Sequence, residues 1–282
     1  MSHADLTSLR SGLWLPLALL FCATLPAAAD ESSPEALGLA LAVEARESKT
    51  GFGNFTARQT MVLRNKRGQE SRRDLRVKVL EVEGDGDKSM FVFDQPRDVE
   101  GTALLIYAHK EAADEQWLYL PALKRVKRIS SANRSGSFMG SEFAYEDMSA
   151  QEVEKYTYRY LRDEPCAQAA GANAPLAEGL ACAVYERFPT DAKSGYSRQE
   201  VWQDRDAARL WKVAYYDRKG DHLKTLTFGS YQQYLDQFWH AHEMEMVNHL
   251  TGKGTVLSWS DYQFRTDLDD GDFTQTGLRR IR

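Results

Sequence analysis

From about residue 54 onward, apolar and polar side chains alternate along the chain with a period of two, which is typical of half-buried β-strands. In residues 70–80, Leu75, Val77 and Val79 share one face, whereas basic residues occupy much of the other. With the similar run before it, this segment predicts a hairpin whose turn is residues 65–69. About a dozen short runs follow one another, separated by turn sequences such as DRKGD and LTGKG. The pattern predicts a mainly β protein with a large antiparallel sheet or barrel.

Residues 33–49 have a different pattern and predict the clearest helix. Ser33 is a suitable N-cap, Pro34 suits the first helical position, and Glu35 falls in the first turn. Glycines at 51 and 53 then end the helix. Beyond it, we expect short helical segments only at MSAQEVEKY, residues 148–156, and near the C-terminus.

The first 29 residues have the features of a secretory signal peptide: the apolar run LWLPLALLFCATLP and then AAA as a small-residue cleavage site. Cleavage after Ala29 leaves residues 30–282, which we expect to form a single domain. Cys22 could suggest a lipoprotein, but Phe21 stands where lipidation needs a small residue. We therefore expect a soluble periplasmic protein.

The two cysteines that remain after cleavage, Cys166 and Cys182, bracket the small-residue insertion AQAAGANAPLAEGLA. In an oxidising compartment, we expect them to form a disulfide that closes the base of this insertion. The alternative is a metal or redox pair, but the spacing matches no metal motif and C-x-x-C is absent. The net charge of −5, with both signs interspersed, argues against nucleic acid as the main partner.

The sequence contains no recognisable catalytic motif: the nucleophile elbow G-x-S-x-G, phosphate-binding glycine loops and dinucleotide fingerprints are all missing. In HAHEMEMVNH, a strand would place His240, His242, Met244 and Met246 on one face, a set that copper could use. A simple two-faced strand explains the same residues. The acidic DLDDGDFT, residues 267–274, lacks calcium-ligand spacing and indicates a solvated loop. We expect neither enzymatic activity nor a metal or cofactor.

The segment GSFMGSEFAYEDM, residues 136–148, combines large apolar side chains with glycines and acidic residues. It follows a basic cluster, which comprises Lys124, Arg125, Lys127, Arg128 and Arg134. This cluster is compatible with an edge strand kept soluble by its charges, or with a contact to anionic headgroups or an acidic partner. The inward-facing positions of a barrel would be aromatic and aliphatic, so they could fill a core or enclose a cavity for an acyl chain.

WLYLPALKRVKRISSANRSGSFMGSEFAYEDM resembles the signature of the LolA-like outer membrane lipoprotein-sorting protein family of Gram-negative bacteria, with W-x-Y-x-P, a basic R-I-S-x segment and S-F-M-G-S-x-F-x-Y-E-D in the same order. EMEMVNHLTGKGTVLSWSDYQF and LDDGDFT also resemble that family, and the likeness spans about residues 33–281. It implies a LolA/LolB-like fold, an incomplete, half-open antiparallel β-barrel of about eleven strands with a few helices covering the opening. The insertion at 166–182 is not part of the family pattern.

The resemblance implies a periplasmic carrier that binds acyl chains of a lipoprotein or lipid in a hydrophobic cavity and moves them towards the outer membrane. Many members resemble accessory proteins of MMPL/RND-type exporters, so an inner-membrane transporter of that class and transient membrane contact are expected. The alternatives are an adaptor with a filled core and a hydrolase. The basic cluster would dock a headgroup or the partner. The expected lipid-binding or gate residues are Phe138, Met139, Phe143, Tyr145, Trp117 and Tyr119.

Overall fold

The computed structural model describes residues 32–280, so the predicted signal peptide at 1–29 lies outside the described residues. Within them, one antiparallel sheet contains thirteen strands. Their bounds are β1 Asn54–Arg64, β2 Glu70–Leu80, β3 Lys88–Gln95, β4 Ala103–Tyr107, β5 Glu115–Leu120, β6 Arg125–Arg128, β7 Tyr156–Pro165, β8 Ala181–Pro189, β9 Tyr196–Asp204, β10 Leu210–Asp217, β11 His222–Tyr234, β12 Phe238–Asn248 and β13 Lys253–Phe264.

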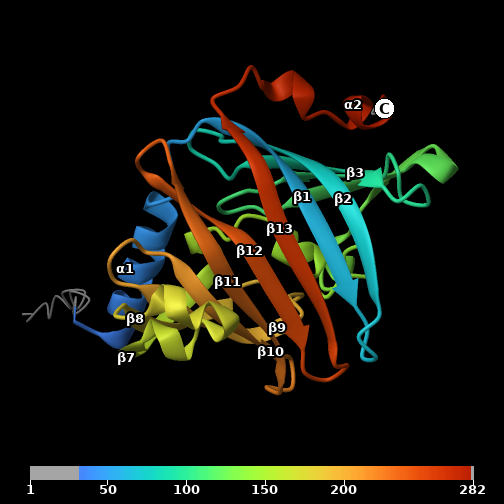
Figure 1. The fold of residues 1–282 in the computed structure, drawn as a ribbon. Coiled ribbons are helices and arrows are strands. Elements are labelled where there is room, and N and C mark those ends of the chain that lie inside the picture. Colours follow the sequence, from blue (N-terminus) through green and yellow to red (C-terminus); the bar gives the residue numbers. More distant parts are fainter. Residues whose placement is uncertain (1–31, 281–282) are drawn as a thin grey trace, which may run out of the picture.

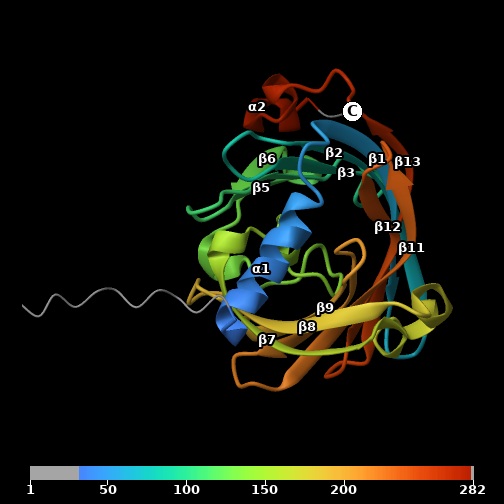
Figure 2. The ribbon, with the colours of Figure 1, turned by 90° about the vertical axis from the view of Figure 1, so that its left-hand side faces the viewer.

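The strands lie in the order β6-β5-β4-β3-β2-β1-β13-β12-β11-β10-β9-β8-β7. The pairing of β1 with β13 joins the first and last strands of the chain in the middle of the sheet. The sheet curls strongly, but its edge strands β6 and β7 do not pair with each other (Figures 1 and 2). The predicted half-open antiparallel barrel is therefore confirmed. It has thirteen strands instead of about eleven, because short strands such as the four-residue β6 still form a complete ladder with their neighbour.

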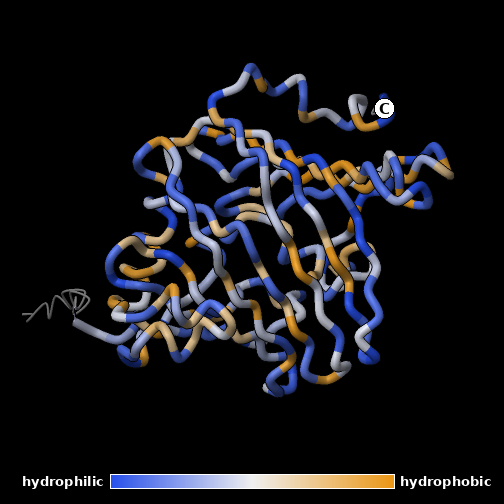
Figure 3. The backbone as a smooth tube through the Cα atoms, in the orientation of Figure 1, coloured by the Kyte–Doolittle hydropathy of each residue, from blue (hydrophilic) through white to orange (hydrophobic). Residues whose placement is uncertain are grey.

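The hairpin of β1 and β2 forms where the alternating pattern predicts it. Leu75 and Val77 are each 1% exposed on the concave face of the sheet. In the turn, the Asn65 side-chain oxygen accepts hydrogen bonds from the backbone nitrogens of Arg67 and Gln69, at 2.8 and 3.1 Å. This side-chain bonding within a short loop is the chemistry that makes asparagine a good turn residue. The alternation of apolar and hydrophilic residues is visible along the strands in Figure 3.

Helix α1, Pro34–Glu47, begins as predicted, because Ser33 Oγ accepts a hydrogen bond from Ala36 N at 3.1 Å. Leu41 and Ala42 face the sheet and are buried. A Cβ at Gly38 would lie 2.8 Å from the backbone nitrogen of Arg159, so only glycine allows the helix to approach β7 this closely. In Figure 2, α1 crosses the opening between the β5–β6 and β7–β8 ends of the curled sheet.

The predicted helical segment at 148–156 is confirmed only in part. Met148 ends one 3₁₀ helix, Tyr145–Met148, and Val153–Lys155 form another, because Glu152 is already extended and β7 begins at Tyr156. The predicted C-terminal helix is confirmed as the short α2, Gln275–Leu278. No helix within residues 32–280 has both the length and the apolar character needed to cross a membrane.

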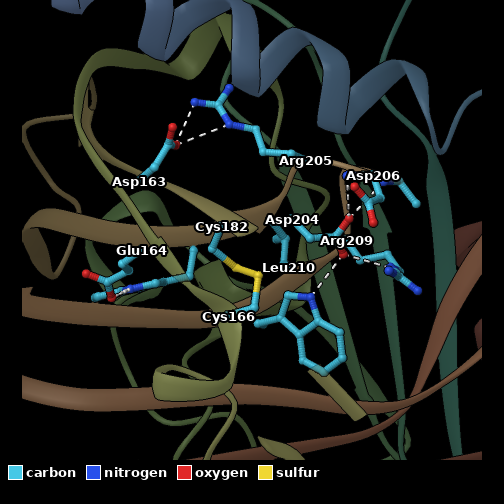
Figure 4. Close-up of a disulfide and its surroundings, with 12 residues drawn as sticks. Asp163, Glu164, Cys166, Cys182, Asp204, Arg205, Asp206, Arg209 and Leu210 are labelled. Carbon is cyan, nitrogen blue, oxygen red and sulfur yellow. Dashed lines mark hydrogen bonds and ion pairs between the residues drawn. A yellow bond between two sulfur atoms is a disulfide. The ribbon is translucent and has the colours of Figure 1, made fainter. Parts of the chain in front are cut away.

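Two segments cover parts of the outer, convex face of the sheet. Phe273 and Leu278 of the C-terminal segment are fully buried in a cluster with residues of β3, β4 and β5. The predicted disulfide between Cys166 and Cys182 is present and closes the β7–β8 connection (Figure 4). Its insertion packs small side chains against Trp202 of β9 and other aromatic residues. Residues on the convex face are therefore buried without contributing to the interior of the barrel.

Candidate functional site

A cavity of about 400 Å³ lies between α1, the concave face of the sheet and the segment 143–153. Its volume falls within the range of about 300–1,000 Å³ that is typical of small-molecule sites. Most of its wall is apolar, and it draws on strands from both halves of the sheet. Prominent apolar lining residues are Phe52, Phe55, Phe91, Val213, Leu226 and Leu257.

Because side chains alternate along a strand, polar, aromatic and methionine side chains of β1, β12 and β13 also reach the cavity. Gln59 and Trp259 are cross-strand partners, and both line the wall. The Gln59 amide and the Trp259 indole nitrogen are buried without a hydrogen-bond partner among the described residues. On β12, His240 and Met244 line the cavity. Burial, followed by the charge of Lys49, lowers the pKa of His240 to about 4, so this histidine is neutral at pH 7.

The sequence predicted that His240, His242, Met244 and Met246 share one face of a strand. In the structure, these side chains lie in different environments. Met246 is fully buried in the core next to the cavity, whereas His242 stacks on Tyr234 with ring centroids 5.9 Å apart. No group of three or more metal-ligating side chains is found within residues 32–280.

Arg46 of α1 carries a compact charged group at one side of the cavity. Its guanidinium lies 3.2 Å from a carboxylate oxygen of Glu152 and 3.5 Å from one of Asp87. Burial raises the pKa of Asp87 to about 6, although the Arg46 charge acts in the opposite direction. These contacts tie the helix to both the sheet and the segment after residue 149.

Lys49 and Arg187 are the other cationic side chains of the cavity wall. Arg187 is 8% exposed; its Nε donates to Gln199 Oε1 at 2.7 Å, and its guanidinium carbon lies 5.0 Å from the centre of the Tyr156 ring. Lys49 follows α1 and is accessible to solvent, which places it at the mouth. Protein surrounds its side chain on the cavity side, and this loss of hydration lowers the pKa of Lys49 to about 8, helped by Arg187 and Arg46.

Residues 136–149, here called the strap, connect the two edges of the sheet across its concave side. Phe138 is fully buried, with ring centroids 5.8 Å from Phe93 and 5.6 Å from Tyr145. Phe143 is 3% exposed and lines the cavity. Met139 is half-buried with a φ of 51°, and its carbonyl accepts a hydrogen bond from Arg73. Of these predicted gate residues, Phe143 reaches the cavity, whereas Phe138, Met139 and Tyr145 pack beside it.

The acidic residues of the strap anchor it, a role that sequence reasoning missed. The Asp147 carboxylate accepts hydrogen bonds from Lys224 Nζ at 2.7 Å, Tyr196 OH at 2.8 Å and Ala144 N at 2.6 Å. The Asp147 and Lys224 side chains are only 5% and 4% exposed. Glu146 likewise accepts from Ser194 Oγ and Gly195 N. The signal was available, since acidic residues interspersed with buried aromatic ones need partners.

Trp117 and Tyr119 lie on the convex face, outside the cavity, where they join the cluster of Phe273 and Leu278. The Trp117 ring packs edge-on against Tyr107, with centroids 5.0 Å apart. Since neighbouring strand residues point to opposite faces, Leu118 of β5 enters the main core, and the partly buried Leu120 packs against it.

The basic cluster is divided in the structure. Lys124, Arg125, Lys127 and Arg128 are exposed at or beside the edge strand β6, where Arg128 forms an ion pair with Glu115 at 2.9 Å. The Arg134 side chain is 11% exposed and pairs with an Asp191 carboxylate at 2.7 Å. Arg134 is therefore largely buried in an ion pair, whereas the other four side chains stay exposed at the sheet edge, with Arg128 alone of them paired to a carboxylate among the described residues.

The fold has relatives among solved structures. A structure from Vibrio parahaemolyticus described as an outer membrane lipoprotein-sorting protein domain is 52% identical, with 86% of this chain and 99% of that chain covered and a TM-score of 0.81. A DUF1329 family protein from Desulfovibrio piger is 28% identical over 88% of this chain and 100% of that chain, with a TM-score of 0.79.

A LolA superfamily protein from Nitrosomonas europaea is 20% identical over 85% of this chain and 98% of that chain, and its TM-score of 0.65 shows a shared fold. Residues 85–280 match the model of a family described as "Uncharacterized protein". A search of the curated proteins gives no match. Together, the similar structures confirm the predicted fold.

Proposed function

We propose a carrier function on the premise that this chain belongs to the LolA-like family of outer membrane lipoprotein-sorting proteins. In this proposal, the protein binds acyl chains of a lipoprotein or lipid in the cavity and moves them through the periplasm towards the outer membrane. It binds and releases its cargo without chemical change. The observation that carries the proposal is the apolar cavity of about 400 Å³ beneath α1.

The energetics of such a carrier follow from its apolar wall. An acyl chain that leaves a bilayer needs a dry environment, because each methylene removed from water contributes about 0.8 kcal/mol. Burial of roughly ten methylenes would thus contribute about 8 kcal/mol. Aromatic and aliphatic side chains such as Phe55, Phe91 and Leu257 supply that environment.

Two features support periplasmic transfer between membranes. The disulfide between Cys166 and Cys182 is of the kind that persists in oxidising compartments. Leu37, Leu39 and Val43 on the outer side of α1 are 41%, 45% and 36% exposed, which suits transient contact with a membrane surface. The predicted signal peptide completes this part of the proposal.

A second candidate function is that of an adaptor for an envelope transporter, and the edge strand β6 is the observation that favours it. Within residues 32–280, no strand pairs with the outer side of β6, which carries exposed lysine and arginine side chains. Such an edge suits an acidic partner surface or anionic headgroups. An MMPL/RND-type exporter in the inner membrane is our proposed partner in either case.

Mass spectrometry of lipids retained by the protein purified from its native periplasm tests the carrier proposal. Ala42 lines the cavity and is 8% exposed, so Ala42→Trp would fill part of it. Ala112 lies exposed in a loop, and Ala112→Trp is the matched control. We expect the wild type and Ala112→Trp to retain lipid and Ala42→Trp to retain much less per folded molecule, with folding checked by urea unfolding. A wild type without lipid under several purification conditions would favour the adaptor.

A further inference from the structure

Most charged side chains around the cavity lie in ion pairs, whereas two cations of its wall do not. Asp147 pairs with Lys224, and Arg46 lies between Asp87 and Glu152. No carboxylate among residues 32–280 is paired with Lys49 or Arg187, the remaining cations of the wall. The apolar cavity thus contains a local excess of positive charge at its α1 side.

Arg187 makes this excess unusual because it is more than nine-tenths buried. In the described part of the chain, the one side chain that accepts a hydrogen bond from Arg187 is the neutral amide of Gln199, through the Arg187 Nε. A buried guanidinium normally has an anionic partner, since its loss of hydration is costly without one. The planar guanidinium presents several donors that suit carboxylate or phosphate oxygens.

Lys49 adds a second cation that acts on the same part of the cavity. Both side chains line the cavity, and after burial the charge of Arg187 is the next cause that lowers the pKa of Lys49. Lys49 is accessible from solvent, whereas Arg187 lies deeper in the wall. An anion between them would be partly shielded from water and would relieve the repulsion between the two side chains.

We propose that the ligand of this cavity is an amphiphile with an anionic head, a carboxylate or a phosphate, held by Lys49 and Arg187 while its acyl chain occupies the apolar wall. The inference rests on the proposed carrier function and narrows its cargo. Acyl chains attached through neutral ester or amide bonds would leave both cations unmatched. A fatty acid or an anionic phospholipid supplies the missing charge.

Competition against a neutral fluorescent acyl probe separates the contribution of the head from that of the chain. The competitors are dodecanoate, dodecyl phosphate and dodecanol, which share one chain length, and inorganic phosphate alone. Because hydrogen bonds to charged groups are stronger than neutral ones, we expect both anionic amphiphiles to bind at least about tenfold more tightly than dodecanol. If dodecanoate binds more tightly than dodecyl phosphate, the head is that of a fatty acid. If dodecyl phosphate binds more tightly than dodecanoate, the head is that of a phospholipid. Both results support the inference.

Lys49→Gln removes one of the two charges at an accessible position, so its effect can be measured without a large loss of stability. We expect it to reduce the preference for dodecanoate over dodecanol by about tenfold. Lys253→Gln is the matched control, because Lys253 is exposed on β13 and does not line the cavity. Arg187→Gln should act in the same direction, and urea unfolding of that variant reports whether it folds.

The affinity for dodecanoate should begin to fall as the pH rises past about 8, because Lys49, with a pKa of about 8, loses its charge there. Arg46 and Arg187 stay charged in this range, and Asp147 is held in its ion pair. Burial raises the pKa of the three tyrosines that line the cavity, Tyr158, Tyr185 and Tyr215, so they stay neutral near pH 8. Asp87 and His240 titrate at lower pH, because their pKa values are about 6 and about 4. Lys49→Gln should lack this pH dependence.

The possible failures are distinguishable. Equal binding of dodecanol and dodecanoate to the wild type overturns the anionic-head inference and leaves the carrier proposal standing. A preference for dodecanoate that survives unchanged in Lys49→Gln and in folded Arg187→Gln also overturns it. Displacement of the probe by inorganic phosphate alone would show a phosphate site without an acyl requirement and would overturn it too. If the probe and all amphiphiles fail to bind, the carrier proposal itself is refuted.

Discussion

Replacing Asp147 by asparagine removes the negative charge that anchors the strap. The substitution preserves the shape of the side chain but leaves Lys224, which is 4% exposed, without its carboxylate. The new amide group can no longer accept all the hydrogen bonds that now come from Lys224, Tyr196 and Ala144. We therefore expect a large loss of stability with little change in packing volume.

The size of the loss follows from breaking a buried ion pair on one side only, which costs about 3–5 kcal/mol. For a domain of this length, each kcal/mol corresponds to roughly 2–4 °C in the unfolding temperature, so Tm should fall by roughly 6–20 °C. The matched control is Asp163→Asn, because the Asp163–Arg205 pair is 53% and 41% exposed. That variant should lose no more than about 1 kcal/mol.

Urea unfolding followed by circular dichroism measures both losses, and a double-mutant cycle with Lys224→Gln isolates the pair. The double variant should lose less than the sum of the single losses, with a coupling of about 0.5–3 kcal/mol. If Asp147→Asn stays within about 1 kcal/mol of the wild type, or if the two losses add, the strap is not held by this ion pair.

Three further results are expected. The Cys166→Ser, Cys182→Ser variant should lose about 3 kcal/mol in urea unfolding, because an open loop of this length has more entropy when unfolded; an unchanged unfolding midpoint would contradict this. Phe138→Ala should lose about 3–5 kcal/mol of stability but retain its lipid, because Phe138 is buried beside the cavity. Phe143→Asp should retain less lipid, because Phe143 lines the cavity. If a stably folded Phe138→Ala loses its lipid, Phe138 is a gate residue. The pKa of Asp87 is raised to about 6 in the folded chain, so its contribution to stability is present below about pH 4 and is lost as the pH rises through about 6. Asp87→Asn should lack this decline when unfolding is measured between pH 4 and 7.

Local features of the fold could be predicted from the sequence because their causes lie within a few residues. Ser33 and Pro34 define the start of α1 through a cap and a fixed backbone angle. Leu75 and Val77 identify the buried face of β2, since strand side chains alternate strictly. The segment 148–156 shows the limit, because its sequence permits a helix but the start of β7 at Tyr156 leaves room only for a 3₁₀ turn.

The candidate site was only partly predictable. The unusual composition of the strap drew attention to Phe143, which does line the cavity. The same reasoning grouped it with Trp117, which lies on the convex face beneath Phe273. Aromatic composition indicates that a residue is buried but does not say which of two buried faces it occupies. The convex face became a buried face only because the C-terminal segment folds back over β3, β4 and β5.

The alternation, the turns, the helix cap and the Cys166–Cys182 disulfide were predicted from the sequence alone and are present in the structure. The tertiary structure was needed to show that Lys49, in the segment after α1, and Arg187 of β8 line one cavity, and that neither forms an ion pair among residues 32–280. It also decided that Asp147 is buried against Lys224. The physical reason is that such contacts depend on how far the sheet curls and where the helix and strap close it. Alternation along a strand specifies which face a side chain occupies, whereas the curvature of the whole sheet specifies what it meets there.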